Sequence, residues 1–226
     1  MRVALVSDGD WRGGIAAARE AGAELICLPQ LSFTPYIAAV RDRAGLELAE
    51  RPPSKLLAEA LGLANGAWLA ASAYESEGEG VFYVTSYLAG PDGELAAYRQ
   101  RRVEAAPQRY EQMFWSPGHT ENQVVRLPAG PATTLVGADL RDPAAWAAVA
   151  HAGGQLVVGG ASDPEEMWSR TVRTAAGMAA AHGLAAVIVN RAGESQGIEY
   201  PGGAAAFAPG GGELPAGAND LYEVPA

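Results

Sequence analysis

The feature that most constrains the fold is the stretch over residues 132–150, ATTLVGADLRDPAAWAAVA. A short apolar strand is predicted over residues 134–136, a bend at Gly137, and an alanine-rich helix over residues 144–151. Strand, tight turn and helix in this order are typical of α/β proteins, where the turn often presents a nucleophile at the end of a sheet. The residue at this bend is glycine, so the turn has no side chain to present.

Strands and helices alternate along the rest of the chain in two comparable halves. This alternation predicts a layered α/β sandwich with mixed sheets. The chain shows neither a linker nor a repeat, so residues 1–226 are expected to form a single domain. The predicted strands cover residues 2–7, 24–29, 67–74, 81–89, 95–99, 123–127, 155–158, 185–189, 203–208 and 221–224, and the predicted helices cover residues 15–21, 55–64, 144–151 and 165–182.

The composition favours a globular protein without nucleic acid or membrane partners. Hydrophobic residues make up 49% of the 226 residues, and the net charge of −10 disfavours binding to phosphate backbones or anionic lipid. No apolar run approaches the roughly 18 residues of a membrane span, and residues 1–10 lack a signal-peptide core. We therefore expect a cytoplasmic protein.

Five segments carry motifs whose order and spacing are informative together. They are GAELICLPQL followed by FTPY (residues 22–36), YRQ (98–100), PQRYE followed by FWSPG (107–118), LVGADLRDP (135–143) and RTAAGMAAAH with NRAG (173–193). The set resembles the nitrilase, or carbon–nitrogen hydrolase, superfamily, and within it the N-carbamoylputrescine amidase branch. This resemblance covers nearly the whole chain and implies the superfamily's four-layer α-β-β-α sandwich.

The resemblance does not extend to the catalytic residues. Enzymes of this superfamily attack an amide, carbamoyl or nitrile carbon with a cysteine, assisted by a glutamate base and a lysine. At the matching positions this chain has Gln30 for the glutamate, Gln100 for the lysine and Gly137 for the cysteine. Neutral amides can neither accept a proton nor supply positive charge, and glycine has no nucleophile. The resemblance therefore implies an intact fold that has lost its triad.

The lost groups are not supplied from elsewhere in the chain. The single cysteine, Cys27, lies inside a predicted strand, where a buried hydrophobic role is favoured over a nucleophilic one. The single lysine, Lys55, opens a helix and is expected to be solvated. His119 follows a turn, whereas His151 and His182 end helices, where a capping role is favoured. Their spacing does not resemble a metal site, so we expect neither a metal nor a cofactor.

Two further positions are candidates for a substrate pocket. Glu111 stands where the superfamily has a second, substrate-orienting glutamate, and Ala138 replaces the tryptophan that follows the cysteine. Glu111 is either a loop surface carboxylate or part of a polar cradle with Gln30 and Gln100 that could hold a small amide or amine. Asp139, which the chain retains, is expected to be structural.

Members of this superfamily pair through the helix after the nucleophile position, which implies a homodimer here. The small residues 144–150 and Trp146 would suit such close packing. Three functions remain open: a catalytically inactive protein that binds a ligand or regulates, an interaction subunit in a mixed oligomer with an active relative, and a hydrolase of a non-peptide C–N bond with displaced groups such as Glu111. A pocket filled by the protein's own side chains would favour a structural role.

Overall fold

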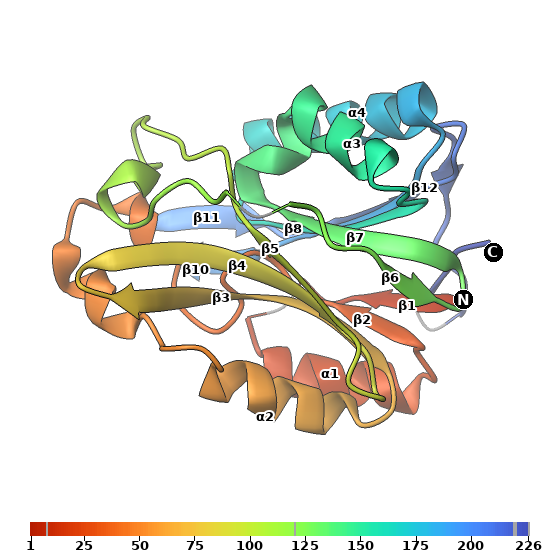
Figure 1. Cartoon of the computed structure of the whole chain (residues 1–226), viewed down its shortest axis with the longest axis horizontal. Coiled ribbons are helices and arrows are strands. Elements are labelled where there is room, and N and C mark those ends of the chain that lie inside the picture. Colours follow the sequence, from red (N-terminus) through yellow and green to blue (C-terminus); the bar gives the residue numbers. More distant parts are fainter. Residues whose placement is uncertain (8, 120, 219–220, 226) are drawn as a thin grey trace.

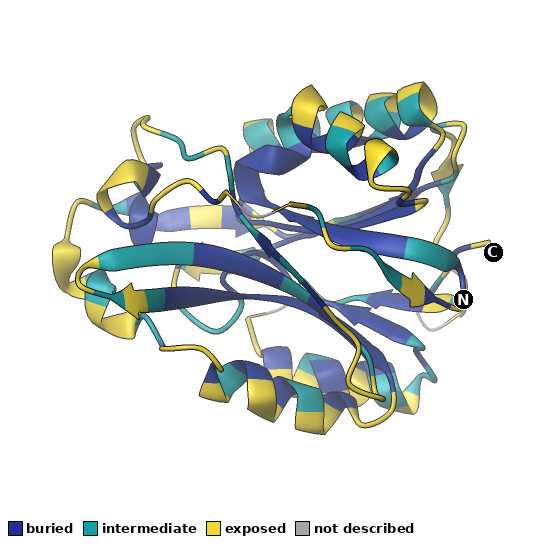
Figure 2. Cartoon of the chain, in the orientation of Figure 1, coloured by how far each residue is buried: buried dark blue, intermediate teal, exposed yellow. Residues whose placement is uncertain are grey.

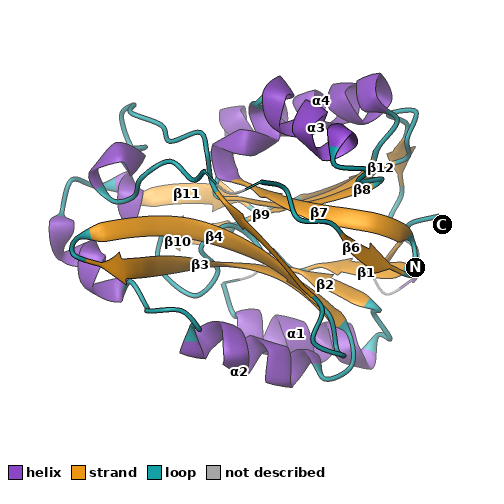
Figure 3. Cartoon of the chain, in the orientation of Figure 1, coloured by secondary structure: helices purple, strands orange, loops and turns teal. Residues whose placement is uncertain are grey.

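The computed structural model describes residues 1–7, 9–119, 121–218 and 221–225. Two six-stranded sheets lie face to face, and a pair of helices covers the outer face of each sheet (Figures 1 and 3). The layer order is α-β-β-α, and both sheets combine parallel with antiparallel pairs. This arrangement confirms the predicted sandwich with mixed sheets.

The first sheet has the strand order β14-β1-β2-β3-β4-β5. Parallel pairing joins β1 to β2 and β2 to β3, and the remaining pairs are antiparallel. The turn at residues 91–93 connects β4 to β5, as the sequence predicts. The strands are β1 (Arg2–Leu5), β2 (Leu25–Cys27), β3 (Trp68–Gly78), β4 (Val81–Ala89), β5 (Leu95–Arg99) and β14 (Leu221–Glu223).

The second sheet has the order β13-β12-β9-β8-β7-β6, with parallel pairing of β7, β8 and β9 at its centre. A separate two-stranded hairpin, β10 with β11, extends beyond this sheet and is absent from the sequence prediction. The strands are β6 (Val125–Leu127), β7 (Gly130–Val136), β8 (Leu156–Ala161), β9 (Ala185–Asn190), β10 (Ala192–Ser195), β11 (Ile198–Pro201), β12 (Ala204–Phe207) and β13 (Glu213–Leu214).

Four α-helices form the outer layers, and side chains cap several of their N-termini. The helix α2 begins after Ser54, whose hydroxyl accepts a hydrogen bond from the Leu57 amide at 3.1 Å, as predicted. No helix among the described residues is long and apolar enough to cross a membrane. The helices are α1 (Trp11–Glu20), α2 (Lys55–Ala64), α3 (Pro143–His151) and α4 (Glu165–His182), and short 3₁₀ helices are η1 (Ile37–Ala39), η2 (Arg43–Leu48), η3 (Glu111–Met113) and η4 (Gly137–Arg141).

Each α-helix buries one face and exposes the other (Figure 2). On α3, Trp146 and Val149 point into the core, and the Trp146 indole donates to the Leu140 carbonyl at 3.1 Å. The expectation that Trp146 packs against a partner is therefore wrong, because the fold buries the ring within the chain. The small residues Ala144 and Ala147 remain exposed.

The two sheets approach each other closely where β8 passes the end of β2. A Cβ atom at Gly160 of β8 would lie 2.7 Å from the Leu28 carbonyl oxygen and 2.9 Å from the Gln30 amide nitrogen. Only glycine permits that approach. Nearby, the hydroxyls of Ser86 and Thr134 form a hydrogen bond of 2.6 Å between the sheets. These contacts join the end of β2 to β8, and β4 to β7, across the sandwich.

Candidate functional site

Three segments bring Gln30, Gln100 and Gly137 together from distant parts of the sequence. Gln30 follows β2, Gln100 follows β5, and Gly137 follows β7. The Gln30 side-chain amide donates to the Gln100 side-chain oxygen at 2.8 Å, and both side chains are buried. We call Gln30, Gln100 and Gly137 the amide cluster.

The space above Gly137 is occupied by the two glutamines. A Cβ atom at this position would lie 2.5 Å from Gln30 Nε2 and 3.2 Å from Gln100 Oε1. Gly137 also has a φ of +59°, in the left-handed region that favours glycine. Both the backbone and the neighbouring side chains therefore select glycine at the turn between β7 and η4.

The segment that carries Gln30 is held by groups from the opposite sheet. Arg191, which follows β9, donates to the carbonyl oxygens of Gln30 at 3.1 Å, Leu31 at 2.6 Å and Thr34 at 2.9 Å. The Ser162 hydroxyl donates to the Gln30 carbonyl at 2.9 Å. The backbone at Gln30 is thus fixed by hydrogen bonds from side chains that follow β8 and β9.

Glu111 begins η3 and is fully buried, so it is not a surface carboxylate. It accepts hydrogen bonds from the Tyr36 hydroxyl at 2.6 Å, the Gln100 side chain at 2.8 Å and the Glu104 amide at 2.9 Å. Burial raises the pKa of Glu111, and the charge of Arg109 and the hydrogen bond from Tyr36 oppose this rise. Glu111 therefore joins the amide cluster on one side and Arg109 on the other.

The retained aspartate is structural, in agreement with the sequence interpretation. Asp139 lies in η4 and accepts hydrogen bonds from the Arg101 and Arg102 amides, both at 2.7 Å, and from the Tyr98 hydroxyl at 2.8 Å. It thereby anchors the segment that carries Gln100. Burial raises the pKa of Asp139 to about 6, although these hydrogen bonds favour the charged form. Ala138, its neighbour, is buried.

A second cluster, which the sequence reasoning missed, lies on the far side of Glu111. Arg109 is 3% exposed and forms ion pairs with Glu104 and with Asp163, the latter at 3.2 Å. Arg141 reaches the same two carboxylates, at 3.1 Å and 2.7 Å. We call Glu104, Arg109, Arg141 and Asp163 the arginine cluster. The only sequence signal for it was the strong preference for arginine over lysine, fifteen residues against one.

The cysteine, the lysine and the helix-end histidines that the sequence offers as reactive groups lie outside both clusters. Cys27 lies in β2 and is buried, and burial raises the pKa of its thiol. Lys55 is exposed at the start of α2. His151 and His182 close α3 and α4. The described residues that meet at the amide cluster therefore include no nucleophile and no lysine.

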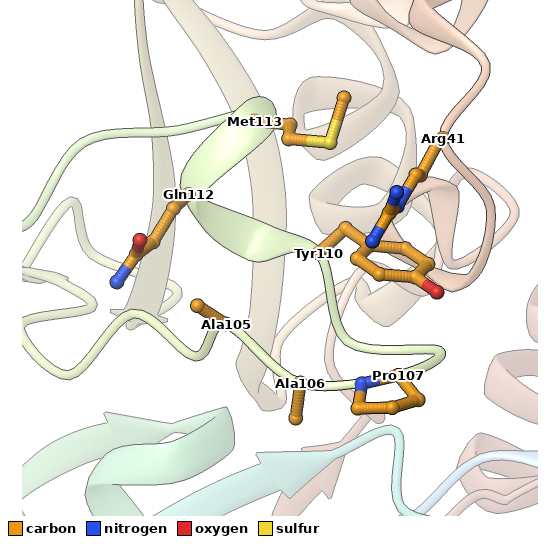
Figure 4. A pocket seen from close by; sticks show the side chains of 7 residues that line it. All are labelled: Arg41, Ala105, Ala106, Pro107, Tyr110, Gln112 and Met113. Carbon is orange, nitrogen blue, oxygen red and sulfur yellow. The ribbon is translucent and has the colours of Figure 1, made fainter.

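Open pockets lie elsewhere on the surface. One of about 240 Å³ is lined by residues of the 105–113 segment and by Arg41, whose guanidinium lies over the Tyr110 ring at 4.6 Å (Figure 4). Another, of about 500 Å³, borders α3 at Ala148 and His151. Neither pocket includes a residue of the amide cluster. The space beside Gly137 is instead filled by Gln30 and Gln100.

The amino-acid sequence matches one known protein family over most of its length. The sequence profile of a family described as carbon-nitrogen hydrolase matches residues 9–220. Comparison with curated protein sequences gives no match.

Solved structures share the fold at low sequence identity. A carbon-nitrogen hydrolase from Helicobacter pylori G27 has a TM-score of 0.79 and 18% identity, covering 98% of this chain and 86% of that one. A cysteine-to-serine mutant of an amidase from Nesterenkonia AN1, of the nitrilase superfamily, has a TM-score of 0.81 and 23% identity over 95% and 86%. A glutamate-to-glutamine mutant of that amidase, with acrylamide added at its active-site cysteine, has a TM-score of 0.80 and 24% identity over 95% and 87%.

Proposed function

Because the chain belongs to the carbon–nitrogen hydrolase family, we propose that it is a member without hydrolase activity that serves as a subunit of an oligomer. The observation that carries this proposal is the occupied space above Gly137. The polar groups of Gln30, Gln100 and Glu111 bond to one another, which supports a structural role over the binding of an amide or amine.

Three chemically interdependent groups are absent from the positions that we match to the triad. A C–N bond hydrolase of this type needs a nucleophile, a base that activates it and a positive group near the developing oxyanion. Loss of a nucleophile alone lowers the rate of such enzymes on the order of a million-fold. The Nesterenkonia amidase with glutamine for glutamate still adds acrylamide at its cysteine. This chain has glycine at the position that we match to that cysteine.

The alternative, hydrolysis that uses Glu111 as the base, has little geometric support. Glu111 is fully buried and already accepts three hydrogen bonds. A base must reach the proton that it removes, directly or through one water molecule. We therefore retain this activity only as the outcome that would contradict the proposal.

The activity is tested with purified protein and aliphatic amides, nitriles and N-carbamoyl amines, by measuring ammonia. We expect no release above the buffer, and none from Gly137→Cys alone. An active amidase is the positive control. Ammonia release by the unmodified chain that disappears in Glu111→Gln would overturn the proposal. Release that is unchanged by Glu111→Gln would also overturn it, and would assign the activity to other residues.

The oligomer is proposed on the exposed side of α3. There the small residues Ala144 and Ala147 allow close approach, and the pocket of about 500 Å³ borders the same helix. The second subunit is a copy of this chain or a catalytically complete relative. Light scattering should give a dimer mass that Ala147→Arg reduces and Ala58→Arg, on the exposed face of α2, does not. A monomer mass for the unmodified chain, with no relative recovered by pull-down from native cells, would contradict the subunit role.

A further inference from the structure

Arg109 is the most enclosed cation in the region around Glu111. Its guanidinium lies 3.2 Å from Asp163 and 3.6 Å from Glu111, and its Nε contacts Glu104. It also donates to the Ser162 carbonyl at 3.0 Å and lies 5.4 Å from the centre of the Tyr36 ring. Carboxylates, a carbonyl and an aromatic face are the groups that recognise a guanidinium.

Arg109 enters this enclosure from a surface turn. Residues 105–108 are exposed, whereas the Arg109 side chain is buried. The amides and carbonyls of Ala106 and Arg109 bond to each other at 3.1 Å and 2.9 Å, and Gln108 has a φ of +61°. A short external turn therefore delivers one side chain into the interior. Among the enclosing groups, Tyr36, Ser162 and Asp163 belong to distant segments of the chain, whereas Glu111 follows Arg109 by two residues.

The walls of the enclosure are held in place independently of Arg109. Asp163 accepts hydrogen bonds from Arg141 at 2.7 Å and Thr171 at 2.6 Å, and its amide donates to Asn190 at 2.8 Å. Glu111 has its own three donors, which include Tyr36. Binding groups fixed by such supports keep their geometry when the occupant changes.

The fit of Arg109 is incomplete. Arg109 Nη2 and Asp163 Oδ1 are buried and have no hydrogen-bond partner among the described residues. Their ion pairs bring opposite charges near each other without good hydrogen-bond geometry. The turn fixes where the tethered guanidinium can lie, and a free guanidinium would have more freedom to align with both carboxylates.

We propose that Glu111, Asp163, Tyr36 and the Ser162 carbonyl form a guanidinium-binding site that the chain fills with its own Arg109. The site takes a small guanidinium compound when this side chain is removed, and in the intact chain Arg109 excludes such a compound. The inference rests on the proposed function, because a site permanently occupied by Arg109 is compatible with a protein that does not turn over a substrate.

The test uses the full-length Arg109→Ala variant and methylguanidinium, followed by calorimetry and thermal melting. We expect one methylguanidinium to bind per chain. At about ten times its dissociation constant, the melting temperature should rise by roughly 3–6 °C. The unmodified chain and Arg170→Ala, which removes an exposed arginine of α4, should show no such rise. Tetramethylammonium carries the same charge without donors and should not stabilise Arg109→Ala.

The double variant Arg109→Ala/Asp163→Asn tests recognition, since it keeps the space and removes one carboxylate charge. Its affinity for methylguanidinium should fall at least tenfold. Should Arg109→Ala not fold alone, its yield on refolding from urea should rise with methylguanidinium and not with tetramethylammonium. Absence of binding together with absence of improved refolding would overturn the inference, as would equal stabilisation of Arg170→Ala. Those results would leave the proposed function intact, which fails only if the ammonia or subunit measurements contradict it.

Discussion

The amide cluster and the arginine cluster fill neighbouring parts of the interior by different means. Gln30 and Gln100 fill space with neutral groups that bond to each other, whereas Arg109 and Arg141 carry charges that need Glu104 and Asp163. Removing one partner from a buried ion pair strands a charge, and removing one amide strands only a dipole. The arginine cluster should therefore contribute more than the amide cluster to the stability of this region.

The largest effect is expected for Asp163→Asn, which keeps the shape and removes the carboxylate shared by Arg109 and Arg141. The unfolding free energy, measured with urea, should fall by about 3–5 kcal/mol because both arginines lose a buried partner. Glu166→Gln, which breaks the exposed pair with Arg170, should change it by less than about 1 kcal/mol. A similar small change for both variants would remove the distinction between the clusters.

Gly137→Ala should be the most damaging single change within the amide cluster. Its φ of +59° and its contact with Gln30 should lower the unfolding free energy by about 2–4 kcal/mol. The matched control is Gly177→Ala, on the exposed side of α4 with open space around it, which should stabilise by up to about 1 kcal/mol. Destabilisation of 5 kcal/mol or more by Gly137→Ala would reverse the ranking of the two clusters.

The pH dependence of stability should separate the clusters by sign. The pKa of Asp139, beside the amide cluster, is raised from 3.8 to about 6, so the folded chain binds the proton more tightly than the unfolded chain. Its contribution to the unfolding free energy should therefore fall by about 1–3 kcal/mol as the pH rises from about 4 to about 6. Urea titrations of the unmodified chain and Asp139→Asn should show this difference.

Glu104 of the arginine cluster should behave in the opposite way. Burial favours its neutral form, but the charges of Arg109 and Arg141 outweigh burial and lower its pKa below 4.5. Its stabilising contribution is present above that pH and is lost as the pH falls below it. Glu104→Gln should therefore weaken the acid-side loss of stability. If Glu104→Gln lost as much unfolding free energy at acidic pH as the unmodified chain, Glu104 would not have a lowered pKa.

The smallest effect is expected for Gln30→Met, which keeps the volume and removes the amide. It leaves Gln100 Oε1 without its donor, and it also removes Gln30 Oε1, which has no partner among the described residues. These changes oppose each other, so the unfolding free energy should fall by about 1 kcal/mol. A loss of 3 kcal/mol or more in urea unfolding would show that the amide pair is as important as the arginine cluster.

Local patterns predicted the regular elements well. The sequence placed β4, β5, α2 and α4 at their observed bounds, because apolar periodicity, turn residues and a serine cap act within short segments. The sequence prediction began α1 four residues late, at residue 15, because Gly13 and Gly14 lower the helix propensity there. In the structure Asp10 caps the helix, which begins at Trp11. The β10–β11 hairpin was missed because each strand has only four residues: β10 combines glycine with exposed polar residues, and β11 ends in proline.

Local sequence patterns likewise identified some residues of the site and missed others. Gln30, Gln100 and Gly137 were found because motif spacing brought each to a known place in the family's pattern. Arg109 was missed because an arginine in a polar loop is usually exposed, and its burial depends on Asp163, 54 positions later in the chain. Whether Gln30 and Gln100 fill the space beside Gly137 depends on their side-chain rotamers, which no local sequence pattern specifies.

The position of Gln30 over Gly137 limits which side chains residue 137 can carry. A mutation that introduced cysteine there would place a Cβ atom 2.5 Å from an amide that already occupies the space. Glutamate at residue 30 would have nearly the same size and would not vacate it. A thiol at residue 137 therefore requires the Gln30 side chain to move first, so a single substitution at this position does not place a thiol in open space.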